Sequence, residues 1–222
     1  WEADRCEPCA ELVGGPDEMT RQMHAERVTS ESKSMAGDIV IAVSPHFYVV
    51  TNLHKKVKLR TRRGSLRLMS AHEVAHLYAQ RCEQAFDDFE HWFGGQIVLP
   101  KPMAVYIVEK EKDQFRIGKR YFGDPETEMN YAFNYTNRIA DGFSGNGFVI
   151  CADTRMSDNG MHGFARHMVG HILFSCWIVT NGFEDHCPRW AWIGAAHFME
   201  KLLKVHDEYA CFCAGETQGS EG

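Results

Sequence analysis

The chain has 222 residues, of which 44% are hydrophobic and 12% aromatic, and a formal net charge of −6. This composition supplies enough apolar residues for a core and excludes a globally disordered chain. The acidic balance argues against a dedicated nucleic-acid-binding domain, which is usually basic, and no apolar run reaches the roughly 18–20 residues of a membrane span. We expect one domain at 38–208, between an irregular arm at 1–37 and a flexible tail at 209–222.

Periodicity along the chain predicts strands first, then a long helix, further strands and two packed helices. Runs of β-branched and aromatic residues predict six strands, at 38–43, 47–52, 57–62, 103–108, 131–136 and 147–152. Apolar stripes and charged turns predict four helices, at 70–93, 109–120, 158–179 and 189–205. This order is typical of an α+β fold, with a small mixed or antiparallel sheet packed on long helices. The last two helices are expected to be central.

The cysteine content favours an oxidising compartment. Eight cysteines are many for a cytosolic protein of this length, and their even number permits up to four disulfides. The chain begins with Trp1, so we expect a secreted or periplasmic protein whose signal peptide has been removed. Cys6 and Cys9 form a CxxC motif, for which a local disulfide is favoured, and a redox or metal-binding module is the alternative.

Residues 72–76 read His-Glu-Val-Ala-His, a literal HExxH motif. In zinc peptidases this motif supplies two metal ligands and a general base. The helical wheel, however, places Glu73 nearly opposite the apolar stripe, and no downstream residue stands out as a third ligand. We therefore expect Glu73 to be solvent-exposed and His72 and His76 to bind no metal. Catalysis by Glu73 with zinc on this histidine pair is the alternative.

A second pair of histidines, His167 and His171, has the same spacing on a helix with almost no polar face. Residues four apart share one face of a helix, and buried imidazoles need a metal, a carboxylate or a carbonyl as partner. A further histidine, His197, lies on the next predicted helix. These three histidines define a candidate metal site, to which His186 or Cys187 of the intervening loop are alternative ligands.

The segment PRWAWIGAAHFME at 188–200, together with HMVGH at 167–171, resembles the gluzincin metallopeptidases, the thermolysin-like or peptidase-MA-like superfamily. Their active helix reads HExxH, and the following helix approximates P-x-W-L-x-E-G-x-A-x-Y-x-E. Six positions match or nearly match this frame: Pro188, Trp190, Gly194, Ala196, Phe198 and Glu200. The strand at 147–152 corresponds to the family's edge strand, and the opening at 45–51 resembles the start of secreted bacterial domains of this type.

The departures from the family pattern are at its catalytic and metal-binding positions. Met168 stands where the family has its general-base glutamate, and Ile193 stands where it has the third zinc ligand. A thioether cannot transfer protons at neutral pH, and an alkyl chain cannot bind zinc. The resemblance therefore implies a secreted pseudo-peptidase, a non-catalytic domain with a binding or assembly role and a protein partner. No cofactor is expected, although His167, His171 and His197 leave zinc possible.

Two other functions stay open at this point. One is an active zinc metallopeptidase that uses either the histidine pair at 72 and 76 or a reorganised three-histidine site. The other is a small metal-binding or redox module based on histidines and cysteines. Metal content of the purified protein separates these hypotheses most directly.

Overall fold

The structure is a computed structural model in which the described residues are 30, 33, 35–60, 65–95, 97–99, 102–122, 138–139, 142–143, 147–152, 158–183 and 187–203. The expected strand at 131–136 and the tail at 209–222 lie outside these residues, as does nearly all of the arm before residue 35.

A four-stranded mixed sheet forms the centre of the fold. Its order is β1 (Val40–Val43), β2 (Phe47–Thr51), β5 (Met103–Val108) and β8 (Gly147–Cys151). β1 pairs antiparallel with β2, whereas β2, β5 and β8 are parallel. The expectation of a small mixed sheet is therefore confirmed, and β8 lies at one edge of it.

Two short antiparallel pairs lie apart from this sheet. β3 (Val57–Arg60) pairs with β4 (Leu66–Met69), and β6 (Arg138–Ile139) pairs with β7 (Gly142–Phe143). The strand expected at 57–62 is β3, but β4 was not expected. Three of its four residues are exposed, so its sequence lacks the alternation of buried and exposed positions that marks a strand.

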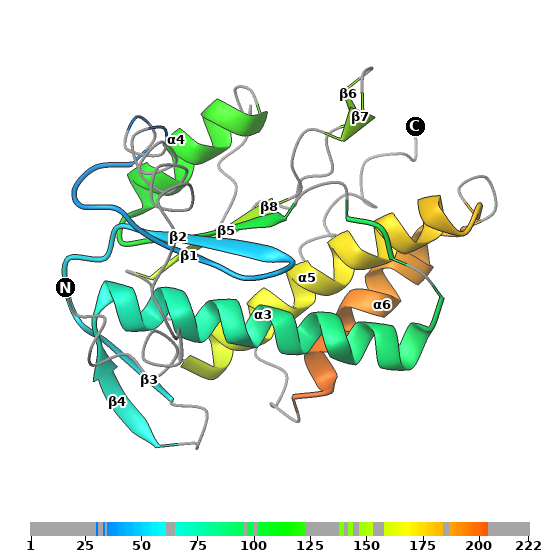
Figure 1. Ribbon diagram of the computed structural model, residues 1–222, viewed down its shortest axis with the longest axis horizontal. Coiled ribbons are helices and arrows are strands. Elements are labelled where there is room, and N and C mark those ends of the chain that lie inside the picture. Colours follow the sequence, from blue (N-terminus) through cyan, green and yellow to red (C-terminus); the bar gives the residue numbers. More distant parts are fainter. Residues whose placement is uncertain are drawn as a thin grey trace, which may run out of the picture.

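Four long helices cover both faces of the sheet. α3 (Ala71–Phe93), α5 (Asp158–Thr180) and α6 (Arg189–Lys201) lie on one face, and α4 (Glu111–Phe122) lies on the other (Figure 1). These helices begin and end close to the expected positions, except that α6 ends at Lys201 rather than at 205. The helical layer on the second face was not part of the expectation.

The central strand β5 shows why helices lie on both faces. All six of its residues are buried. Alternate side chains of a strand point to opposite faces, and Val105 and Ile107 join the main core with α3 and α5, whereas Tyr106 and Val108 join a smaller core with Ile117 of α4. A continuous apolar run is therefore the signature of a strand covered on both sides.

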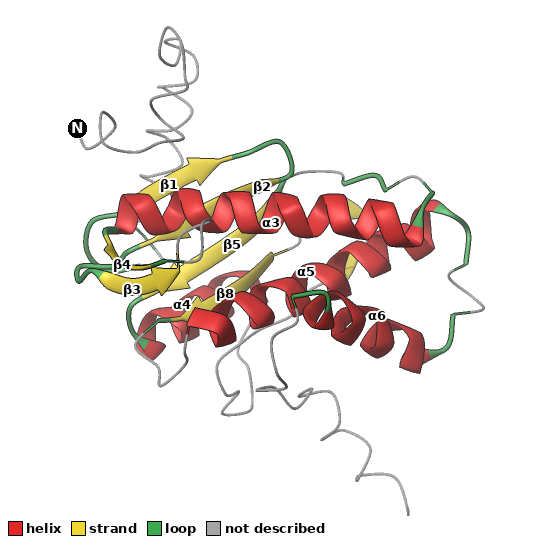
Figure 2. Cartoon of the chain, turned by 90° about the horizontal axis from the view of Figure 1, so that it is seen from below, coloured by secondary structure: helices red, strands yellow, loops and turns green. Residues whose placement is uncertain are grey.

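The helix α5 is enclosed by its neighbours, as its almost uniformly apolar sequence predicts. It packs against α3, α6 and β8. Figure 2 shows α3, α5 and α6 in one layer, with α6 outermost. A Cβ atom added at Gly170 would lie 2.9 Å from Met199 Cγ and 3.1 Å from Ala196 Cα, so this glycine permits the close approach of α5 and α6. Within the described part of the chain, no helix is long and apolar enough to cross a membrane.

Candidate metal site

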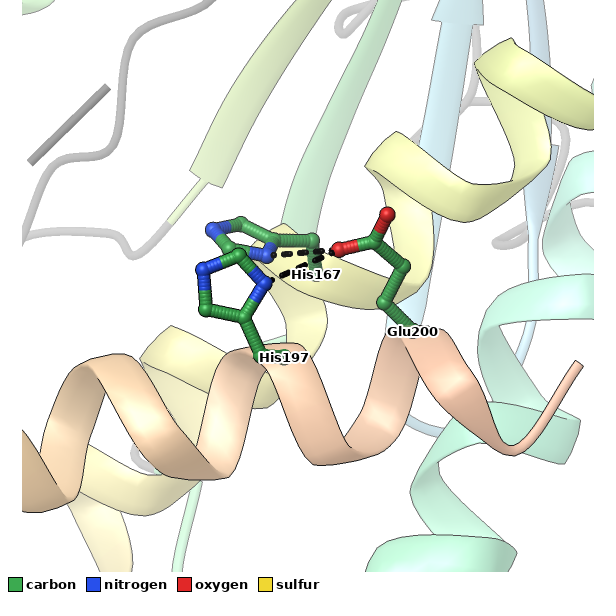
Figure 3. Close-up of side chains that lie close together, drawn as sticks. All are labelled: His167, His197 and Glu200. Carbon is green, nitrogen blue, oxygen red and sulfur yellow. Dashed lines mark hydrogen bonds and ion pairs between the residues drawn. The ribbon is translucent and has the colours of Figure 1, made fainter. Parts of the chain in front are cut away.

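Three potential metal ligands meet where α5 packs on α6. His167 projects from α5, and His197 and Glu200 project from successive turns of α6 (Figure 3). The rings of His167 and His197 have centroids 4.9 Å apart and an interplanar angle of 71°, so the two helices bring these histidines into edge-to-face contact. Each residue offers one ligand atom, and the three atoms lie within 4.8 Å of one another.

The carboxylate of Glu200 is the centre of this cluster. Its Oε2 atom lies 3.3 Å from Nδ1 of His167 and 3.3 Å from Nδ1 of His197 (Figure 3). Zinc ligands at about 2.0–2.1 Å in tetrahedral geometry are separated from each other by roughly 3.3 Å. Both distances to Glu200 therefore match two edges of a tetrahedral zinc site.

The site is buried on one side and partly exposed to solvent on the other. His167 and Glu200 are buried, whereas 31% of the His197 side chain is exposed. Burial, followed by the neighbouring His171 and His197, lowers the pKa of His167 to about 3. The His167 imidazole is consequently neutral at pH 7, and the neutral imidazole is the form that binds a metal.

His171 lies beside this cluster but does not complete it. Its ring centroid is 4.7 Å from that of His167, yet it is not among the three residues whose ligand atoms converge. Burial, and then the nearby His197, lowers the pKa of His171 to about 4. Its Nε2 atom is buried without a hydrogen-bond partner among the described residues. The residues whose ligand atoms converge are therefore two of the three expected histidines and a glutamate, with His171 as a neighbour.

Sequence reasoning missed the role of Glu200. The resemblance to the gluzincin frame places the third ligand at Ile193 and gives Glu200 no metal-binding role. The available signal was the spacing of His197 and Glu200, since residues three apart on a helix are neighbours. That spacing predicts a paired ligand only if the same helix face meets His167, and this depends on how α6 packs.

The two positions that depart from the gluzincin pattern carry no group that could act as a base or bind zinc. Met168 is 4% exposed and belongs to the main core with the sheet and α3. Ile193 is half-buried and has no group that could bind a metal. Of the alternative ligands, Cys187 lies outside the cluster and directs its Sγ at the carbonyl of Pro188, 3.8 Å away, and His186 is not among the described residues.

The glutamate of the HExxH motif helps to cap the N-terminus of α3. Ser70 is the N-cap, and its backbone N–H and hydroxyl both interact with Glu73 in a capping box. Arg67 donates a further contact to Glu73. Although burial would raise its pKa, the hydrogen bonds from Ser70 and the charge of Arg67 hold the pKa of Glu73 below its ordinary value. A carboxylate held in this way is poorly suited to act as a general base near neutral pH.

The surroundings of this motif also differ from the expectation. Only 25% of the Glu73 side chain is exposed, so this residue is half-buried and not solvent-exposed as expected. The rings of His72 and His76 have centroids 4.6 Å apart. Burial, and then the proximity of His72, lowers the pKa of His76 to about 4. The cluster of three ligands described above does not include either histidine.

The described cysteines do not form the expected disulfide framework. Cys82, Cys151, Cys176 and Cys187 are thiols, with no disulfide among them. Burial raises the pKa of Cys82 to about 12, which keeps this thiol protonated in the core. The other four cysteines, Cys6, Cys9, Cys211 and Cys213, lie outside the described residues. None of the up to four disulfides that the cysteine count permits is therefore formed among the described cysteines.

Comparisons with known proteins add no family assignment. The chain matches no protein-family model, no curated protein and no solved structure. The geometry of the α5–α6 pair is therefore the basis for the functional argument.

Proposed function

We propose that this protein is a metal-binding, non-catalytic domain of gluzincin-like type, in which His167, His197 and Glu200 hold a divalent transition metal. The observation that carries the proposal is the placement of one buried carboxylate oxygen 3.3 Å from an imidazole nitrogen of each histidine. Such a group of neutral imidazoles and a carboxylate suits zinc, which takes nitrogen and oxygen ligands in tetrahedral geometry.

Two described positions considered for a general base, Met168 and Glu73, support a non-catalytic role. The frame position for the base is occupied by Met168, whose side chain is buried in the core. On α3, Glu73 is engaged by Ser70 and Arg67. Bound metal would then stabilise the α5–α6 pair and the surface around it, in keeping with a secreted pseudo-peptidase that acts through binding or assembly.

Metal binding is tested on the purified chain after treatment with a chelator. Isothermal titration with zinc is expected to give one site per chain, and Glu200→Gln or His197→Ala is expected to weaken binding at least 100-fold. The matched control is the double variant His72→Ala, His76→Ala, which removes the other histidine pair and should leave the stoichiometry and affinity unchanged. Unaltered zinc binding in Glu200→Gln would disprove the proposed site, and loss of binding in the control would move the site to α3.

An active hydrolase is the second candidate, and one observation favours it. The cluster supplies three protein ligands, and 31% of the His197 side chain is exposed, which leaves room for a fourth, exchangeable ligand. Catalytic zinc sites have this composition of three protein ligands and an open position. Zinc-loaded protein is therefore incubated with a peptide library. Cleavage that a chelator abolishes and Glu200→Gln eliminates would replace the non-catalytic proposal.

A further inference from the structure

The outer face of α6 carries an apolar stripe that is exposed among the described residues. Trp190, Gly194 and Phe198 follow one another at intervals of four residues, so they share one side of the helix. Trp190 is 74% exposed and Phe198 is 38% exposed. Trp92 of α3 is 57% exposed and lies beside Phe198, with ring centroids 5.7 Å apart, so the stripe continues onto the neighbouring helix.

Gly194 is the unusual member of this stripe. It lies in the interior of α6, where glycine is less favourable than alanine because of its conformational freedom. At Gly170 the packing explains the glycine, because a Cβ atom would press on Met199 and Ala196. At Gly194 a Cβ atom would have no neighbour within 4 Å. The fold of a single copy therefore gives no steric reason for a glycine at this position.

We propose that this face is the interface of a symmetric dimer, in which α6 of one copy packs antiparallel on α6 of a second copy. A two-fold axis through Gly194 places Trp190 of one copy opposite Phe198 of the other, because both lie four residues from the axis. Two equivalent aromatic pairs form in this way, and the absence of a side chain at Gly194 lets the helices approach closely where they cross. A two-fold interface requires such a self-complementary surface.

The size of the surface fits a weak dimer. A large aromatic side chain can bury 150–250 Å², so the exposed parts of Trp190, Phe198 and Trp92 together offer on the order of 400 Å² per copy. Stable interfaces bury about 800 Å² per partner. We therefore expect association in the micromolar range or weaker, in exchange with the monomer. His197 of the proposed metal site borders this face, since it follows Trp190 by seven residues on α6, but the aromatic contacts need no metal, so dimerisation does not require it.

Sedimentation equilibrium with a chelator present tests this interface. The mass of the wild-type chain is expected to rise from 25.3 kDa toward twice this value as its concentration increases to about 500 μM. Gly194→Lys places two like charges at the crossing point and Trp190→Ala removes the aromatic pair, so both should remain monomeric. Neither change needs a buried space, since both positions are exposed. The matched control is Phe115→Lys, which alters a 50% exposed aromatic residue on α4, across the sheet, and should dimerise as the wild type does.

Two outcomes would overturn the proposal. One is a wild-type chain that stays at 25.3 kDa throughout the concentration series. The other is a dimer that Gly194→Lys and Trp190→Ala leave unchanged, or that Phe115→Lys weakens to the same extent. A dimer that forms only when zinc replaces the chelator would also contradict it, because the contacts proposed here involve no metal.

Discussion

Arg166 on α5 donates a hydrogen bond of 2.6 Å to the carboxylate of Asp88 on α3. The same guanidinium donates through Nε to the backbone carbonyl of Met199 on α6, at 2.9 Å. Arg166 is only 2% exposed, so one buried cation joins three helices. It directly precedes His167, and Met199 directly precedes Glu200. The hydrogen bond to Met199 therefore fixes the register of the two helices at the candidate metal site.

The first prediction concerns this positioning role. Arg166→Lys keeps the positive charge, but the lysine ammonium cannot donate to both acceptors as the planar guanidinium does. The register of α5 and α6 should loosen, so zinc affinity should fall by about 10- to 100-fold. The fold should also lose about 2 kcal/mol, because the buried carbonyl of Met199 or the half-buried carboxylate of Asp88 loses its donor. Zinc titration and urea unfolding measure the two effects.

A second buried arginine provides the control for this variant. Arg81 of α3 donates two hydrogen bonds, of 2.9 and 3.2 Å, to the carboxylate of Asp158 at the start of α5. It joins α3 to α5 but is not placed at α6. Arg81→Lys should destabilise the fold to a similar degree and leave zinc affinity unchanged. Equal loss of affinity in both variants would mean that Arg166 acts only through overall stability.

The second prediction compares two glycines in helices. Gly170→Ala should destabilise the protein by about 1 kcal/mol, because overpacking against Met199 and Ala196 outweighs the gain in helix propensity. Gly194→Ala, where the space is open, should stabilise it by about 1 kcal/mol. Urea unfolding at low protein concentration gives both values. Similar effects at the two positions would contradict the close approach of α5 and α6 at Gly170.

The third prediction links metal to stability. Free zinc at about 100 times its dissociation constant should raise the free energy of unfolding by about 2.7 kcal/mol, since only the folded chain brings the ligands together. Glu200→Gln should lose this increment, and its stability without metal should change little because a buried charge is also removed. Thermal unfolding with and without zinc measures the difference. A wild-type transition that zinc does not move would contradict this expectation.

The fourth prediction concerns acid sensitivity and His162 on α5. Burial, followed by the charges of Arg81 and Arg166, lowers the pKa of His162 to about 3, compared with 6.5 for an ordinary histidine. Between pH 6.5 and about 3 the unfolded chain therefore binds one more proton at this position than the folded chain does. Its contribution to stability is complete above pH 6.5 and decreases as the pH falls.

Replacing this histidine isolates its share of the effect. Between pH 6 and 5, His162→Gln should lose about 1 kcal/mol less stability than the wild type does. Urea unfolding at each pH provides the measurement. Parallel pH profiles for the two proteins would show that the pKa of His162 in the folded state is that of an ordinary histidine.

The fifth prediction concerns Met168. In the family frame, Met168→Glu would restore the general base. Because Met168 is 4% exposed within the main core, the carboxylate would instead be buried without a partner. We expect a loss of about 3 kcal/mol or more and no gain in peptidase activity. Met168→Leu, which preserves the apolar volume, should cost less than about 1.5 kcal/mol. A well-folded Met168→Glu variant that cleaves peptides would contradict this expectation.

The local elements were predictable from the sequence because their signals are local. The apolar stripe and the Ser70–Glu73 capping box define the start of α3. The β-branched run at 103–108 defines β5, and the uniformly apolar segment after residue 158 defines a buried helix. These patterns depend on the periodicity of one element, which a single sequence contains. The hairpin strand β4 was missed because it buries too little of its surface to show such a pattern.

The composition of the site was decided only by the tertiary structure. Whether Glu200 or His171 joins His167 and His197 depends on how α6 is rotated and shifted against α5, and that packing is set by Gly170, Met199 and the Arg166 hydrogen bond. Likewise, the HExxH spacing on α3 is formally complete, but the fold uses its glutamate to cap the helix. Spacing determines which residues share a helix face, whereas packing determines which faces meet, and ligands converge only when both conditions hold.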